Sequence, residues 1–300
     1  MLVNFVLINE TLDRANMEPV AEVLSLYGIK TVISSYDGRL GACEADAVVL
    51  GHDWSECARN VINEWKIAGK KTILLQHEGF FSIEEDWYNG SYPICDLALL
   101  WGEAHADIFK SRGYDGNHVI TGPIHFDQHT KEKKITKDSV ARSINISPDL
   151  GWNVFATQHF DREGNWKARN LIQRELGQEH AKRHYMPIFK LHPQEDNNMR
   201  KLLGFDRKEV LDINPNCEFI QHCPDLIRVA DTWMAWSSTT LLERAILGLS
   251  YDQRCDYHPI LDKHGGHNIA AILDNFCGGP LDGENANRAA MAIADLFGIK

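Results

Sequence analysis

Several features that define common protein classes are missing from this sequence. No window approaches the roughly 18 consecutive apolar residues of a membrane-spanning helix, and residues 1–14 lack the charged region and cleavage site of a signal peptide. The seven cysteines are odd in number and form no C-x-x-C pair, which argues against a disulfide framework or a zinc site. We therefore expect a soluble, cytoplasmic protein with no transmembrane segment and no metal site.

Basic residues are scarce in the first part of the chain. The formal net charge is −11, and residues 1–130 hold 9 Lys and Arg against 19 Asp and Glu, whereas residues 131–300 hold 22 against 23. An acidic first half repels polyanions, while the balanced second half can hold a local anion site. Duplex nucleic acid is therefore disfavoured as a partner.

Two common phosphate-binding loops are also missing. Neither G-x-G-x-x-G nor G-x-x-x-x-G-K-[ST] follows a predicted strand, which disfavours dehydrogenases and P-loop kinases. What is present is an alternation of short apolar strands with helical segments, which is typical of parallel sheets covered on both faces. The predicted strands occupy residues 2–9, 30–35, 45–51, 71–76, 95–102 and 118–122 in the first series, and 152–158, 186–192, 217–221 and 231–237 in the second.

A polar, basic segment without periodicity, residues 127–139, separates the two series. Two α/β halves joined by a linker account for 300 residues better than one oversized sheet does. We predict four parts: an N-terminal Rossmann-like domain over residues 1–127, a linker over 128–148, a C-terminal domain over 149–284, and a last helix over 285–300.

In the first half, polar residues follow the predicted strand 71–76. Ligands bind at the carboxyl ends of strands in such folds, and His77 and Glu78 lie there, just ahead of Gly79. Either side chain could act as a general base, and the glycine would let a ligand approach the backbone. An ordinary polar loop with one capping acid explains the same residues without a ligand.

In the second half, the run Ser237-Ser238-Thr239 stands where a helix begins. Its hydroxyls and the first backbone N–H groups of the helix together suit a phosphate, and Glu243 lies one turn further along, where it could bind a ribose. A capping box formed by Thr240 and Glu243 is the alternative interpretation, and it needs no ligand.

Two other strand ends of the second half carry polar residues. His192 and Pro193 follow the strand that contains Lys190, and a histidine there could donate to a diphosphate or protonate a leaving phosphate. Gln158 ends the strand 152–158 and could line the same cleft. The histidines at 52, 105, 125 and 159 show no recognisable metal-ligand spacing.

Taken in order, these stretches resemble the GT-B glycosyltransferases of bacterial polysaccharide assembly. The resemblance rests on "QHEGF", "CDLALLWGEAHADIFKSRG", "VITGPIHFD", "FKLHP" and "ADTWMAWSSTTLLERAILG", and covers roughly residues 70–250. The sialyltransferase, capsule and CDP-glycerol phosphotransferase-like groups are nearest, and non-hydrolysing UDP-GlcNAc 2-epimerases are more distant.

The resemblance implies an α/β protein of two Rossmann-like parallel-sheet domains that face a cleft, with a C-terminal helix that crosses back to the first domain. It also implies that His192-Pro193 and Ser237-Ser238 match the HP and SS motifs, which hold the donor nucleotide and its phosphate, with Glu243 toward the ribose. The base motif departs from the family pattern, because His77 replaces the first acid of an acidic pair. The base is therefore His77 or Glu78.

The implied function is a metal-independent glycosyltransferase. It would move a sugar or a polyol phosphate from a CMP-, CDP- or UDP-linked donor to a hydroxyl of a glycan or lipid-linked acceptor, with the sugar nucleotide as substrate and no cofactor. A homodimer is compatible with the sequence. The alternatives are a sugar-nucleotide 2-epimerase, a viral-type DNA base glycosyltransferase, and a catalytically silent module that binds sugar nucleotides.

Overall fold

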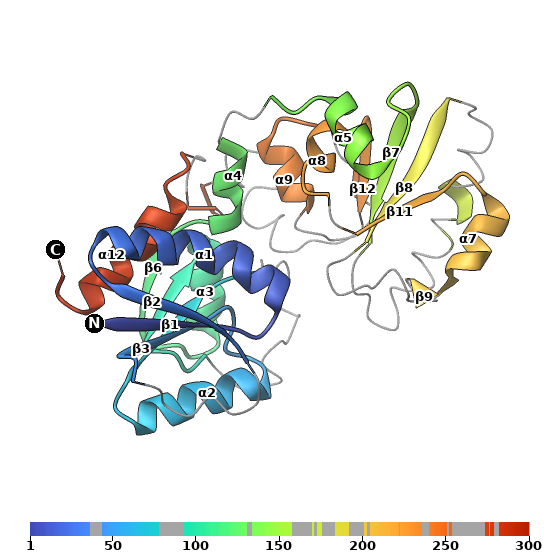
Figure 1. Ribbon diagram of the computed structural model, residues 1–300. Coiled ribbons are helices and arrows are strands. Elements are labelled where there is room, and N and C mark those ends of the chain that lie inside the picture. Colours follow the sequence, from blue (N-terminus) through green and yellow to red (C-terminus); the bar gives the residue numbers. More distant parts are fainter. Residues whose placement is uncertain are drawn as a thin grey trace. The chain divides into compact units, whose positions relative to one another are not determined.

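The computed structural model contains two α/β units (Figure 1). Met1–Glu132 and His258–Lys300 form the first unit, and Lys133–Tyr257 form the second. The structure describes residues 1–36, 44–77, 93–130, 134–157, 170, 173–175, 184–191, 201–202, 205–221, 223–235, 240–250, 252–253, 274–275, 277–278 and 282–299.

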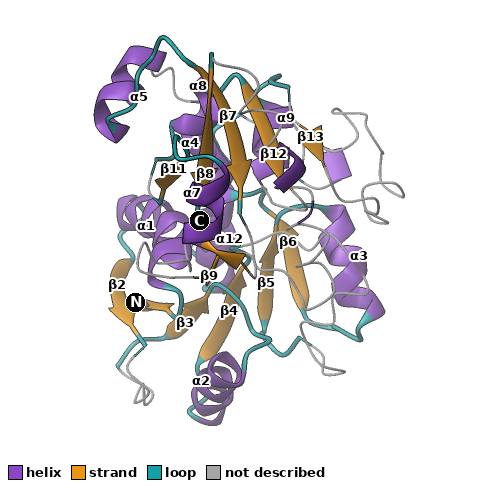
Figure 2. Cartoon of the chain, turned by 90° about the vertical axis from the view of Figure 1, so that its right-hand side faces the viewer, coloured by secondary structure: helices purple, strands orange, loops and turns teal. Residues whose placement is uncertain are grey.

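A parallel six-stranded sheet forms the centre of the first unit, in the order β2-β1-β3-β4-β5-β6 (Figure 2). Short strands such as AVVL and LALL are buried along their whole length, as expected for a parallel sheet that is covered on both faces. The strands are β1 (Leu2–Leu7), β2 (Lys30–Ser35), β3 (Ala47–Leu50), β4 (Lys71–Leu75), β5 (Leu97–Leu100) and β6 (Asn117–Ile120). The helices that follow them are α1 (Glu10–Leu26), α2 (Glu56–Ile67), α3 (Glu103–Ser111), η1 (Ile124–Phe126) and α4 (Asp127–Thr130).

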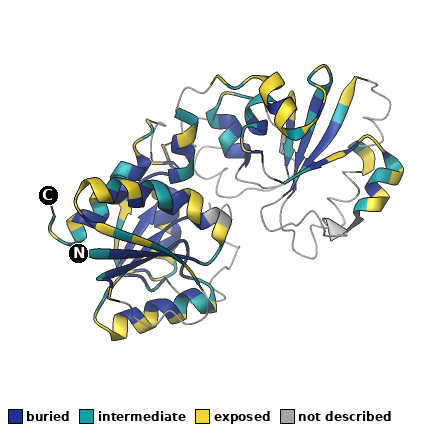
Figure 3. Ribbon diagram, in the orientation of Figure 1, coloured by how far each residue is buried: buried dark blue, intermediate teal, exposed yellow. Residues whose placement is uncertain are grey.

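Two apolar clusters cover the faces of this sheet, and its central strands are coloured as buried in Figure 3. Successive strand residues point to opposite faces, so Phe5 packs with Met17 of α1, whereas Val6 packs with Val61 and Trp65 of α2. Within the described ranges, no helix combines the length and the apolar character that crossing a bilayer requires.

The last helix, α12 (Asn285–Leu296), returns to the first unit and packs on α1. The carboxylate of Asp127 accepts the backbone N–H groups of Asn285 and Ala286 at 3.3 and 2.9 Å, which satisfies the first turn of α12. Gly122, at φ +82°, has no room for a side chain, because a Cβ would lie 2.2 Å from the Asn285 Oδ1 atom. The predicted return of the C-terminal helix is confirmed.

The second unit contains a parallel five-stranded sheet in the order β11-β8-β7-β12-β13. Its buried centre includes Trp152 and Trp233, which pack with apolar residues of the helices beside them. The strands of this sheet are β7 (Gly151–Ala156), β8 (Tyr185–Lys190), β11 (Glu218–Ile220), β12 (Thr232–Ala235) and β13 (Asp252–Gln253). Among the described residues, this unit also contains α5 (Lys137–Ile144), α7 (Arg207–Ile213), α8 (Leu226–Val229), α9 (Thr240–Ile246) and the antiparallel pair β9 (Lys201–Leu202) and β10 (Phe205–Asp206).

The structure divides the chain differently from the predicted boundaries. The segment 128–148, predicted to be a linker, contains α5, which begins with a capping box between Thr136 and Ser139 and buries Val140 and Ala141 in the second unit. Only a few apolar residues mark this helix, so its polar composition hides its periodicity. Residues 258–284, predicted to belong to the C-terminal domain, group with the first unit.

Three aspartates clamp neighbouring strands at the amino edges of the two sheets. Each aspartate directly precedes a strand and makes two hydrogen bonds with one residue of the neighbouring strand. The backbone N–H of the aspartate donates to the carbonyl of that residue, and the aspartate carboxylate accepts the backbone N–H of the same residue. The pairs are Asp46 with Leu2, Asp96 with Thr72, and Asp231 with Trp152, and the carboxylate distances are 2.9, 2.9 and 2.7 Å. Because a slip of one residue would break both bonds, each clamp fixes the register of its strand pair.

Two of these clamps depend on a charged carboxylate. Desolvation alone would raise the pKa of Asp231, but the hydrogen bonds from Lys137 and the Trp152 amide outweigh it and hold this pKa below the ordinary 3.8. The pKa of Asp96 is lowered in the same way, by hydrogen bonds from Thr72 and Lys66 that outweigh desolvation. A lowered pKa in the folded state contributes stability at neutral pH that is lost as the pH falls through that pKa.

The substitution Asp231→Asn tests the clamp. Because the Asp231 side chain is nearly half exposed, we expect it to cost only about 1 kcal/mol, so that amide hydrogen exchange at Trp152 becomes about fivefold faster at pH 7. In unfolding experiments the difference from the wild type should shrink as the pH falls below 3.8. Asp149→Asn, at an exposed acid two residues before β7, is the control, and equal exchange in both variants would contradict the clamp.

Candidate functional site

His77 and Asp13 form a buried pair at the carboxyl edge of the first sheet. The His77 Nδ1 and Asp13 Oδ1 atoms are 2.5 Å apart, and the two side chains are 3% and 0% exposed. The other carboxylate oxygen of Asp13 accepts the backbone N–H groups of Ile8 and Asn9, both at 2.7 Å. With a carboxylate as acceptor, Nδ1 of His77 carries the proton and Nε2 carries the lone pair. This tautomer makes Nε2 the ring nitrogen that can accept a proton.

Gly51 makes this pair sterically feasible. It follows β3, and β3 lies between β1, which leads to Asp13, and β4, which leads to His77. A Cβ on Gly51 would lie 2.0 Å from Asp13 Oδ1 and 2.3 Å from His77 Nδ1, on the hydrogen bond itself. The carbonyl of Gly51 also accepts the backbone N–H of His77 at 3.3 Å. Any larger residue here would force the two side chains apart.

A row of aromatic rings leads away from His77. Its ring meets the ring of His52 edge to face, with centroids 5.2 Å apart, and His52 stacks on Trp54 at 4.6 Å. The Nε2 atom of His52 lies 2.7 Å from the Oγ atom of Ser55, the N-cap residue of α2. These ring contacts connect the His77–Asp13 pair to the loop between β3 and α2.

A second histidine is held by the same helix. Asn16, one turn after Asp13 on α1, accepts a hydrogen bond from Nδ1 of His125 at 3.2 Å. The ring of Trp101 lies 5.3 Å from that of His125, and Trp101 donates its backbone and indole N–H groups to Gln76, at 2.9 and 2.7 Å. The first turns of α1 thus orient two imidazoles at one sheet edge.

In the second unit, the strands that lead to the predicted donor site end level with one another. Ala156 at the end of β7 pairs with Lys190 of β8 on one side and with Ala235 of β12 on the other. Along the sequence, Gln158, His192 and Ser237 each follow one of these three residues by two positions. The sheet therefore brings the attachment points of all three segments to one edge.

Only three of the predicted site residues lie within the described residues. His77 is in the buried pair, Lys190 ends β8 and accepts the Thr157 backbone N–H on its carbonyl at 2.9 Å, and Glu243 lies partly exposed in the first turn of α9. The others fall outside the described residues: Glu78, Gln158, His192, Pro193, Ser237, Ser238 and Thr239.

The start of α9 is held on two sides. Thr240 lies inside the helix, and its hydroxyl accepts the indole N–H of Trp233 at 3.0 Å, a contact that the predicted capping box did not include. Arg244, 1% exposed, donates to the carbonyls of Ile227, Ala230 and Ser250, and burial lowers its pKa. These bonds join α9 to the end of α8.

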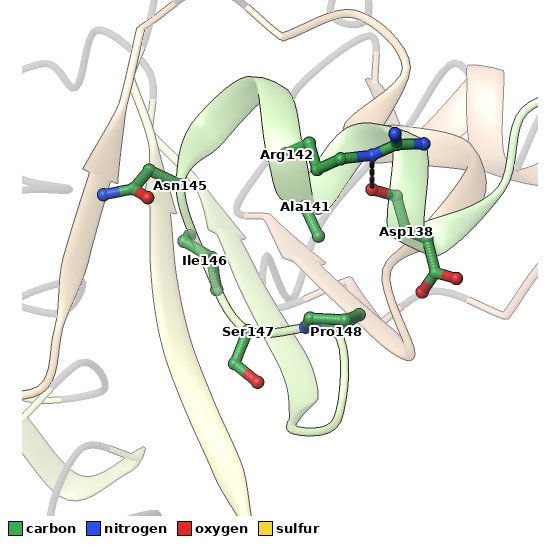
Figure 4. Close-up of a pocket in the computed structure, with 7 residues that line it drawn as sticks. All are labelled: Asp138, Ala141, Arg142, Asn145, Ile146, Ser147 and Pro148. Carbon is green, nitrogen blue, oxygen red and sulfur yellow. Dashed lines mark hydrogen bonds between the residues drawn. The ribbon is translucent and has the colours of Figure 1, made fainter.

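A shallow hollow of about 560 Å³ lies at the end of α5 (Figure 4). Its lining runs from Asp138 to Pro148, and Arg142 donates a hydrogen bond to the Asp138 carbonyl at 3.2 Å. This segment leads into the amino end of β7, whereas Gln158 follows the carboxyl end of that strand.

Asp13 and Gly51 are not among the site residues predicted from the sequence. Asp13 lies in the first turn of α1, where an acid is common because it favours the helix dipole. Gly51 could have indicated this site from the sequence, because it directly follows a fully buried strand. A glycine at such a strand end often marks a place where other side chains or a ligand approach the backbone closely.

No family model and no curated protein sequence matches this chain. Solved structures do match it over nearly its whole length. S. aureus MnaA with UDP has a TM-score of 0.69 at 11% identity, covering 100% of this chain and 97% of its own. UDP-GlcNAc 2-epimerase from Neisseria meningitidis, bound to UDP-GlcNAc, has a TM-score of 0.66 at 11% identity, covering 98% and 99%. The wall teichoic acid polymerase TagF has a TM-score of 0.56 at 13% identity, covering 98% and 88%.

The chain has the GT-B fold. The predicted α/β architecture with two parallel sheets is confirmed, and so is the likeness to both GT-B glycosyltransferases and 2-epimerases. The N. meningitidis 2-epimerase matches the chain with a higher TM-score than TagF does. Identities of 11–13% establish the fold, and the activity has to be argued from the residues.

Gly51→Ala should separate His77 from Asp13 without unfolding the protein. In ¹⁵N-histidine NMR spectra we expect the hydrogen-bonded Nδ1 proton of His77 to be lost or strongly shifted, because the new methyl group occupies the position of the bond. Gly151→Ala is the matched control: the three atoms nearest to its Cβ would all belong to the ring of Tyr185, which is 41% exposed. An unchanged Nδ1 signal in Gly51→Ala would contradict the geometry of the pair.

Proposed function

We propose that this protein is a metal-independent glycosyltransferase. It moves a sugar, or a polyol phosphate, from a nucleotide-activated donor to a hydroxyl of a glycan-type acceptor. The observation that carries this proposal is the buried His77–Asp13 pair at a strand end of the first GT-B unit, an arrangement that suits proton removal from a hydroxyl group.

The acceptor step uses the first unit. Nε2 of His77 takes the proton as the acceptor oxygen attacks the donor. With a sugar donor, the oxygen attacks the anomeric carbon and the bond from that carbon to the nucleotide phosphate breaks. With a polyol phosphate donor, it attacks the phosphorus of the transferred phosphate and the P–O bond to the nucleotide breaks. Asp13 stabilises the imidazolium that forms and holds the ring in the required tautomer. His77 is assigned as the base rather than Glu78, because His77 has an anionic partner at hydrogen-bond distance and a buried setting.

The donor step uses the second unit. Negative charge develops on the departing nucleotide phosphate, and hydroxyls, an imidazole and helix N–H groups stabilise such charge. The level ends of β8, β7 and β12 support this role for the segments that follow them. In this proposal His192, Ser237 and Ser238 bind the phosphate, Gln158, Lys190, Pro193 and Thr239 line the donor site, and Glu243 binds the ribose.

A 2-epimerase is the second candidate. The S. aureus and N. meningitidis structures match the chain with TM-scores of 0.69 and 0.66, above the 0.56 of TagF. A base pair near a sugar nucleotide also suits proton abstraction from the donor itself. The two functions differ in their need for an acceptor: a sugar nucleotide that isomerises with the protein alone, without any glycan, would establish the epimerase and overturn the transferase.

Binding of nucleotides gives a first test. In a thermal-shift panel of CMP, CDP, UDP and GDP we expect pyrimidine nucleotides to raise the unfolding temperature, by an amount that corresponds to about 2.7 kcal/mol at a hundredfold excess over Kd. UDP is favoured by the two nucleotide-bound neighbours, and CMP or CDP by the HP and SS motifs. A response to GDP alone would contradict both expectations.

The base assignment predicts a ranked set of activities. His77→Gln should lower kcat by about 10²–10⁴-fold, because the proton acceptor is lost, whereas Asp13→Asn, which keeps the shape but not the charge, should lower it less. Glu78→Gln is the matched control and should retain activity. Steady-state kinetics with a saturating donor measures all three, and nucleotide affinity should stay unchanged. Inactive Glu78→Gln beside active His77→Gln would reverse the assignment.

A further inference from the structure

The first sheet ends on a strand that lacks the usual protection against pairing. Among the described strands, β2 pairs with β1 alone, in an unbroken register, and lies at the end of the sheet. Edge strands are commonly protected by proline, a bulge or several charges, but the sequence of β2, KTVISS, has no proline and one charge, on Lys30. At the opposite edge, Gly278 lies against Ile120 of β6, where a Cβ would be 2.6 Å from the Ile120 Cγ2 atom. β2 therefore presents an edge to which another strand can add.

Three residues of β2 turn their backbone hydrogen-bonding groups away from the sheet. The backbone N–H of Lys30 donates to the carbonyl of Met1, which precedes β1, at 3.2 Å. Because successive residues of a strand point these groups to opposite sides, those of Thr31, Ile33 and Ser35 point outward. Among the described residues, none forms a hydrogen bond with the backbone groups of these three.

Exposed apolar side chains accompany this edge. Val32 of β2 is 48% exposed, and Leu26 and Tyr27, in the turn that leads into β2, are 84% and 40% exposed. A shallow hollow of about 560 Å³ lies beside them, lined by residues 28–32 together with Leu2 and Ser25. Apolar surface that is gathered in one place, next to unpaired backbone groups, indicates an interaction site for another protein chain.

The charges around β2 suit a second copy of the same chain. Residues 23–36 contain no acid and one base, Lys30, although residues 1–130 hold 19 acids. Two copies can therefore meet here without the repulsion expected of a strongly acidic unit. Lys30 begins β2, and Glu10 lies at the other end of the strand, where its carboxylate accepts the hydroxyl of Ser35 at 2.9 Å. In an antiparallel pair, the base of each copy lies at the same end as the acid of the other.

We propose that β2 pairs antiparallel with β2 of a second copy about a twofold axis, so that the two six-stranded sheets become one continuous sheet. The register centred on Ile33 is the one that pairs all three outward residues. Ile33 then lies opposite Ile33 of the partner subunit, and Thr31 lies opposite Ser35 of the partner subunit. Each of these pairs exchanges two backbone N–H···O=C bonds, which satisfies the outward groups of both copies. The same register brings Tyr36 of one copy beside Lys30 of the other, next to the hollow.

Sedimentation velocity of the full chain, over about 1–500 µM, tests the assembly. We expect a reversible dimer. Val32→Glu should raise its Kd by about tenfold or more, because two like charges then lie on the same face beside the twofold axis. Val119→Glu, on the opposite edge strand β6, is the matched control, since Val119 is 38% exposed, and it should leave the Kd unchanged. A monomer over the whole range, or a Kd that Val32→Glu changes no more than Val119→Glu does, would overturn the proposal.

Amide hydrogen exchange, followed by NMR, locates the contact. The N–H groups of Thr31, Ile33 and Ser35 should exchange about tenfold or more faster in Val32→Glu than in the wild-type dimer, because they lose the partner strand. The N–H of Ser34 points toward β1 and should change little, so it serves as the internal control. Slow exchange of the three outward groups in a monomer would mean that a segment of the same chain covers β2. Fast exchange of these groups in a dimer would mean that the copies meet elsewhere, and either result overturns the proposal.

Discussion

Parallel strands held in register are the constraint on which both units depend. At the amino edges, Asp46, Asp96 and Asp231 each bind one residue of a neighbouring strand through two hydrogen bonds, so these strand pairs start level. Strands of similar length that start level also end level, and their carboxyl ends then hold the polar segments side by side. The clamps thus stabilise one edge of each sheet and align the edge where the candidate chemistry lies.

The His77–Asp13 pair depends on the register of β1, β3 and β4. Its partners come from two strands separated by β3, and the absence of a side chain at Gly51 lets them meet above it. Asp13 is then fixed by the N–H groups of Ile8 and Asn9, so the geometry of the pair is set by backbone as well as by side chains. The ring of His52 contacts the rings of both His77 and Trp54.

Much of the fold could be predicted from the sequence, because buried parallel strands read as short apolar runs and the helices between them show their own period. The polar residues that follow the strands could also be located, because the end of each apolar run marks the end of a strand. The partner of His77 was not, because Asp13 lies 64 residues away and the contact depends on the strand order β1-β3-β4, which local patterns do not encode. Helix α5 was missed since its sequence, KDSVARSI, buries only Val140 and Ala141.

The central claim is that His77 acts as the base because Asp13 holds it. The most direct measurement is the pH dependence of kcat/KM for acceptor-dependent transfer, compared between the wild type and Asp13→Asn. The rate should fall on the acidic side as His77 becomes protonated, and this limb should move to lower pH in Asp13→Asn, because the variant lacks the negative charge that stabilises the imidazolium. Superimposable profiles would contradict the account and assign the proton transfer to another residue.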